Sequence, residues 1–121
     1  MSHRVNSTQP PHIARLNTRL KLQRPQELED DMGGRDIAWQ DVAELWVGID
    51  PVSGKNEDWH EMSAATVRAR VWMRHRRDFE VRAGMRLVDP AGGERALFIE
   101  AVYDPDGRRR HLVALCEERP L

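Results

Sequence analysis

The residues that most often carry chemistry are sparse in this chain, and their spacing assembles no site. The five histidines include no pair spaced for metal binding on a helix. His60-Glu61 starts like a zinc-protease motif, but Ala64 stands where the second histidine ligand is needed. Cys116 lies in an aliphatic run, which favours a buried, inert thiol over a nucleophile. We therefore expect no enzyme activity, no metal and no cofactor.

An arginine-rich stretch at residues 66–74 offers a different chemistry. Small and aliphatic side chains alternate there with three arginines and Trp72, so the arginines and the tryptophan share one face of a strand. Such a face can grip phosphates and stack on bases, as in a nucleic-acid-binding β-barrel. The slightly negative net charge of −1 instead favours pairing with acidic groups or with a neighbouring subunit. The candidate subunit-interface residues are Arg68, Arg70, Trp72, Arg74, Arg76 and Arg77.

Charge is strongly segregated along the chain. Residues 1–24 carry a net +5, residues 25–64 a net −9, residues 65–86 a net +5 and residues 87–121 a net −2. Blocks of opposite sign can attract copies of one chain to each other. They can equally be solvated faces that pair within one subunit, and the sequence leaves both interpretations open.

Period-two alternation predicts the elements that must position these residues. Residues 16–25 place Leu20 and Leu22 on one face and charged side chains on the other, with Pro25 ending the strand or marking an edge. The apolar stretch 39–54 predicts a central strand that leaves a turn at Gln40-Asp41 and stops at Pro51. A single helical turn is expected within residues 56–62.

The second half of the chain predicts short strands separated by turns. Further strands are expected at residues 66–74, 85–88, 95–103 and 111–116, the last two joined as a hairpin through the turn at 104–107. The fold class is therefore all-β: a small antiparallel barrel or sandwich of six to seven strands, with one long loop and at most one short helix. The expected core residues are Leu20, Leu22, Trp46, Val71, Ile99, Val102, Val113 and Leu115.

The length of 121 residues fits one domain. Residues 1–16 are polar and predict a flexible N-terminal arm, which leaves residues 17–121 as a single β-barrel domain. A lone cysteine indicates a reducing compartment, and the polar start predicts no signal peptide. No apolar run approaches membrane length, so we expect a soluble cytoplasmic protein without a membrane partner.

Several short motifs, taken in order, resemble the phage head–tail joining proteins, also called head-closure or stopper proteins. The resemblance covers about residues 16–118. In the first half the motifs are Leu20–Pro25, Gly33-Gly34, Trp39–Trp46 and Pro51–Gly54. In the second half they are Gly84–Leu87, Phe98–Pro105 and Leu112–Glu117. The connection at 89–95 is longer, and the strand at 66–74 richer in arginine, than this family leads us to expect.

The resemblance implies a ring of six identical subunits in the neck of a tailed phage, a prophage remnant or a gene transfer agent. Its partners would be an adaptor or portal-side neck protein above, a tail terminator or tail tube protein below, and double-stranded DNA in the channel. The protein would reside in the host cytoplasm during assembly and in the particle neck afterwards. A loop of such proteins projects into the channel and retains DNA, although an outward loop that docks a neighbouring protein is the alternative here. The candidate channel-loop residues are Ser53, Gly54, Lys55, Asn56, Glu57 and Asp58.

Overall fold

A computed structural model describes residues 16–29, 31–51 and 67–121, and within these ranges every regular element is a strand. The expected helical turn in 56–62 and most of the predicted N-terminal arm lie outside the described residues. The all-β prediction is confirmed. The six strands are β1 (Thr18–Glu29), β2 (Arg35–Pro51), β3 (Val67–Arg74), β4 (Arg86–Val88), β5 (Arg95–Tyr103) and β6 (His111–Pro120).

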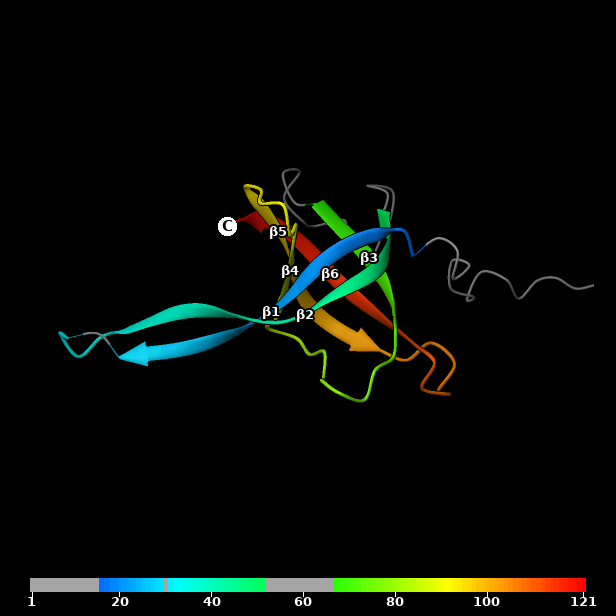
Figure 1. Cartoon of the computed structure of the whole chain (residues 1–121), viewed down its shortest axis with the longest axis horizontal. Helices are drawn as coiled ribbons and strands as arrows, with labels where there is room; N and C mark the ends of the chain where they lie inside the picture. Colours follow the sequence, from blue (N-terminus) through cyan, green and yellow to red (C-terminus); the bar gives the residue numbers. More distant parts are fainter. Residues whose placement is uncertain (1–15, 30, 52–66) are drawn as a thin grey trace, which may run out of the picture.

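The strands close into an antiparallel barrel in the order β1-β2-β3-β6-β5-β4, with β4 returning to pair with β1 (Figure 1). The closing strand is short, and Leu87 at its centre lies opposite Leu22 of β1 on one side and Leu97 of β5 on the other. A closed barrel leaves no unpaired strand edge around its wall.

The core follows from the inward face of each alternating strand. Leu22, Val47, Val71 and Met73 are almost fully inaccessible to solvent and pack with residues from all six strands. Of the expected core, four residues lie in this cluster, and Val102 packs against it. Val113 is buried outside the cluster and Leu115 is half-buried. The four confirmed residues are Leu20, Leu22, Val71 and Ile99.

The prediction that Trp46 lies in the core is wrong. Its side chain is 56% exposed, and the Arg19 guanidinium lies 5.5 Å from its ring centre. The physical reason is register: β2 runs without a break through this region, so Leu45 and Val47 point inward and Trp46 points out. Because apolar residues occupy both faces of this stretch, the sequence alone did not indicate which face is buried.

The turn predicted at Gln40-Asp41 is also wrong, because both residues lie inside the 17-residue strand β2. The β1–β2 reversal falls at the Gly33-Gly34 motif, which the sequence also marks as a turn, and the φ of 83° at Gly33 suits glycine. β1 continues past Pro25, which pairs with Trp39 of β2. Because β4 pairs with β1 only as far as Gln23, the other side of β1 has no neighbouring strand at Pro25. Pro25 therefore lies on an open edge, as its missing N–H requires.

The result is a long β1–β2 hairpin that extends away from the barrel (Figure 1). A register shift between Leu22 and Gln23 separates its inner part, which belongs to the barrel wall, from its outer part. We call residues 24–29 and 31–40 the outer hairpin. All of its described β1 residues are exposed.

Candidate functional site

A network of charged side chains crosses the outside of the barrel from β3 to β5. Arg68, only 8% exposed, lies between Glu100 and Glu117, and its Nη2 is 3.2 Å from Glu117 Oε2. Arg119 joins the same glutamates, at 2.7 Å from Glu117 and 3.8 Å from Glu100. The hydrogen bond from Arg119, together with the Arg68 charge, lowers the pKa of Glu117. The network ties three strands together.

Stacked arginines and aromatic rings continue this network to the hairpin. The Arg119 guanidinium lies 4.8 Å from the centre of the Phe98 ring, and Arg86 lies 4.2 Å from Trp39 and 5.9 Å from Phe98. Arg86 also donates a hydrogen bond to Gln23, and its partial burial lowers its pKa. Trp39 meets Phe98 edge to face at 5.9 Å. These contacts brace the base of the outer hairpin against the barrel.

The predicted subunit-interface residues divide into two groups. Arg68 and Trp72 are buried within the subunit, and Arg70 is half-buried. Arg74, Arg76 and Arg77 are exposed at and just beyond the end of β3. Of these six residues, only Arg74, Arg76 and Arg77 therefore present accessible charge.

The exposed arginines belong to a larger basic surface formed by residues 74–82 and 104–110, which we call the basic loops. The two segments lie together because β3 pairs with β6, and the His75 N–H donates to the Arg110 carbonyl at 3.0 Å. The β6 side of this surface was missed by sequence reasoning. Only the β3–β6 pairing, between strands distant in sequence, places it there.

The predicted channel-loop residues 53–58 lie outside the described residues. The flanking Pro51 and Val67 lie at one end of the barrel, since Pro51 pairs with Ala69.

No described group of three or more histidine, cysteine, aspartate or glutamate side chains could hold a metal ion. Burial, and secondarily the Glu100 charge, raises the pKa of the Cys116 thiol to about 12. Within the described part of the chain, no helix is long and apolar enough to cross a membrane.

Comparison with known families decides what kind of protein this barrel is. The family model described as phage head completion protein matches residues 11–119, nearly the whole chain. The chain belongs to this family. It is thereby a structural component of a phage or phage-like particle, as the motif resemblance implied.

Two solved structures share the fold of this head completion protein. A chain in the virion of a native gene transfer agent particle is 23% identical, with a TM-score of 0.65 over 87% of this chain and 96% of that one. A protein of Shigella flexneri 2a, solved in solution, is 29% identical, with a TM-score of 0.63 over 89% of this chain and 96% of that one. A comparison with curated proteins gave no match.

Proposed function

We propose that this head completion protein forms a ring in the particle neck, joins the portal-side proteins to the tail and helps to retain packaged DNA. The observation that supports this most is the family match over residues 11–119, on a barrel whose fold also occurs in a gene transfer agent virion. A ring suits a small domain, because burying faces against identical copies adds stability that its own small core cannot supply. Six copies, as in the resembled family, are the proposed number.

The alternative of a free-standing nucleic-acid-binding barrel depended on the arginine strand. That strand is poorly placed to grip phosphates, because Arg68 is occupied by Glu100 and Glu117 and Trp72 is buried. The structural connector is therefore the better supported function.

The test is particle assembly without this chain. In cells that make every other particle component, we expect DNA-filled or leaking heads and separate tails, because the joining ring is missing. Supplying the wild-type chain in trans should restore joined particles, counted by electron microscopy and by infection or transfer. Normal numbers of joined particles in the absence of the chain would refute the proposed function.

Within this ring we propose that segment 52–61 faces the channel. The proposal is supported by the sequence: Glu57, Asp58 and Glu61 would repeat in every copy and set many carboxylates near the axis. Such a field repels DNA phosphates over a screening distance of about 8–10 Å at ordinary salt. DNA would be blocked by bulk and like charge, without adhesive contacts that hinder its later ejection.

Deletion of residues 55–58 tests the channel position. We expect the ring to assemble on the heads, but the filled heads to lose DNA before tails attach, because the shortened segment no longer blocks the channel. DNA retention is measured as nuclease-resistant DNA per head, with wild-type particles as the control. Retention equal to wild type, in heads that carry the shortened chain, would show that the segment faces a partner instead.

A further inference from the structure

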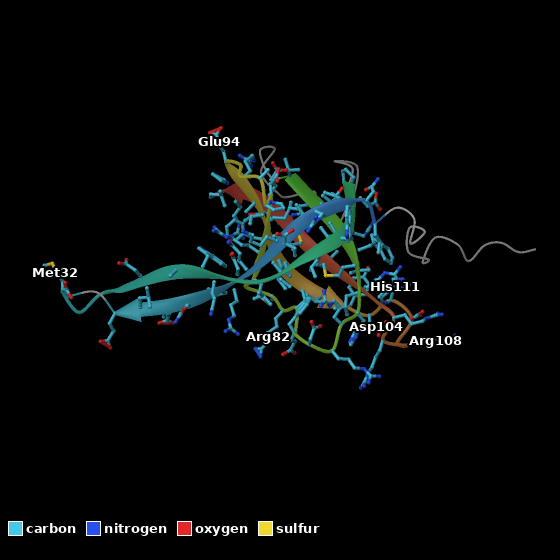
Figure 2. The ribbon with its side chains drawn as sticks, in the orientation of Figure 1. Met32, Arg82, Glu94, Asp104, Arg108 and His111 are labelled. Atoms are coloured by element: carbon cyan, nitrogen blue, oxygen red, sulfur yellow. The ribbon has the colours of Figure 1, made fainter. Side chains whose placement is uncertain are left out.

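Beyond its base, the outer hairpin is a two-stranded ribbon that neither β3 nor β4 extends. β4 pairs with β1 only as far as Gln23, and β3 pairs with β2 only from Val47 onward. A two-stranded ribbon is marginally stable alone in water. This one also exposes apolar side chains: Leu28 is 46% exposed, Ile37 60% and Met32, at its tip, 92% (Figure 2). Such a projection is suited to covering a surface on another molecule.

The outer hairpin is also acidic, and side-chain contacts hold its base against the barrel. Residues 27–36 contain five acidic residues against one basic residue. The Trp39 contacts with Arg86 and Phe98 hold its base, and Gln23 donates to Asp41 at 2.8 Å beside them. These contacts fix the direction in which the hairpin leaves the barrel, which lowers the entropy lost on docking.

The basic loops carry the complementary charge. They contain seven arginines against four acidic residues. Three of the arginines bond to acids in the same loops: Arg76 to Asp78, Arg82 to Glu80 and Arg110 to Asp106. The other four are exposed and form no ion pair with another described residue: Arg74, Arg77, Arg108 and Arg109.

Hydrogen bonds order the loop that presents two of these arginines. Asp104 accepts from the N–H groups of Gly107 at 2.9 Å and Arg109 at 2.8 Å, which fixes Arg109 at a φ of 58°. Asp106 accepts from the Arg108 N–H at 3.0 Å, and its bond to Arg110 lowers the pKa of Asp106 to about 2. The acids of this loop thus shape it and leave Arg108 and Arg109 facing solvent.

The tip of the outer hairpin and the 104–110 part of the basic loops lie toward opposite ends of one molecule (Figure 2). Figure 2 places Met32 at one extreme of the molecule and Arg108 toward the other, beyond the barrel. The hairpin tip of one copy therefore cannot reach the 104–110 segment of the same copy, whereas it can reach that of a neighbouring copy (Figure 2). Complementary surfaces on opposite sides generate head-to-tail contacts that close into a ring when the rotation fits.

We propose that the outer hairpin of one copy docks on the basic loops of the next. This inference rests on the proposed ring and names the contact that closes it. Both surfaces belong to the same chain and so occur in equal number, which favours a second copy over DNA or another neck protein as the occupant. Opposite charge steers the approach, and Leu28, Met32 and Ile37 contribute apolar area to the contact.

Cysteine cross-linking in assembled particles tests the contact. Met32→Cys combined with Arg108→Cys should give covalent multimers after mild oxidation, whereas each single variant should give none. Cys116 does not interfere, because it is 1% exposed. Only monomers from the double variant, in particles whose tails joined normally, would overturn the contact while leaving the proposed function intact.

Charge reversal supplies a second readout. One set is Glu27→Lys, Glu29→Lys and Asp31→Lys; the other is Arg74→Glu, Arg77→Glu and Arg108→Glu. Each set alone should lower the yield of joined particles about tenfold or more, the equivalent of about 1.4 kcal/mol, and the combined sets should restore most of it. Melting temperatures equal to that of the wild type would show that the substitutions do not act by unfolding the chain.

Failure of the combined sets to restore joining would overturn the proposal. If the hairpin set alone is defective, the hairpin binds a different neck protein. If the loop set alone is defective, the basic loops bind DNA or that protein. If both sets are defective without rescue, the two surfaces have separate partners. Each of these results differs from the loss of joining caused by removing the whole chain.

Discussion

Leu22→Ala is expected to lower the free energy of unfolding by about 2–5 kcal/mol, the usual cost of a cavity at a buried leucine. Leu22 is fully buried and lies opposite Leu87, at the pairing of β1 with β4 that closes the barrel. It also precedes the register shift where the outer hairpin begins, so the surrounding backbone is constrained on both sides and can relax little into the void. Chemical denaturation measures the loss.

Trp46→Ala is the matched control for this variant. The substitution removes more atoms than Leu22→Ala, but the side chain is exposed on the neighbouring strand β2. We expect it to lower the free energy of unfolding by only about 0.5–1 kcal/mol, from the lost stacking with Arg19. A loss for Trp46→Ala as large as that for Leu22→Ala would contradict the inward and outward assignment of β1 and β2.

Arg68→Ala is expected to cost about 2–4 kcal/mol at neutral pH. The substitution removes the buried cation and leaves Glu100 and Glu117 with the more exposed Arg119, and breaking a buried ion pair from one side is strongly destabilising. The expected loss is smaller than for a fully buried ion pair, because both glutamates retain some contact with water. Denaturant unfolding at pH 7 measures the effect.

The pH dependence of that loss identifies its cause. The pKa of Glu117 is lowered in the folded state, so its carboxylate contributes stability above its ordinary pKa of 4.5, and this is lost as the pH falls through the folded pKa. Without Arg68, Arg119 offsets only part of the glutamate charge, and protonation of Glu117 relieves the remaining repulsion. The difference between Arg68→Ala and wild type should therefore shrink below about pH 4.

Arg95→Ala provides the control for Arg68. Arg95 pairs with Glu118 at 2.6 Å, but this pair is exposed to solvent and is expected to contribute about 0.2–1 kcal/mol. Equal losses for Arg68→Ala and Arg95→Ala, or a loss for Arg68→Ala that is unchanged at acidic pH, would mean that burial of the Arg68 network has no energetic consequence.

Sequence reasoning succeeded where one face of a strand is buried. The alternation around Leu20 and Leu22, and around Val71, reports burial directly, because only the inward positions must be apolar. The hairpin of β5 and β6 followed from a turn whose residues, Asp104 and Gly107, make the hydrogen bonds and backbone angle of the reversal. These parts depend on local chemistry alone.

The outer hairpin was missed because both of its faces are exposed. Without a buried face there is no apolar alternation, so the acidic residues 27–36 resemble a loop and Gln40-Asp41 a turn. The burial of Arg68 was missed for a different reason. Its partners Glu100 and Glu117 are 32 and 49 residues away, and only the pairing of β6 with both β3 and β5 brings them to Arg68.

The proposed position in the neck is tested most directly by electron cryo-microscopy of the particle neck. We expect a closed ring of copies of this chain between the portal-side proteins and the tail, with each barrel recognisable by its projecting β1–β2 hairpin. A complete neck in which no ring density fits this barrel, or in which that layer is built from a different chain, would contradict the proposed function.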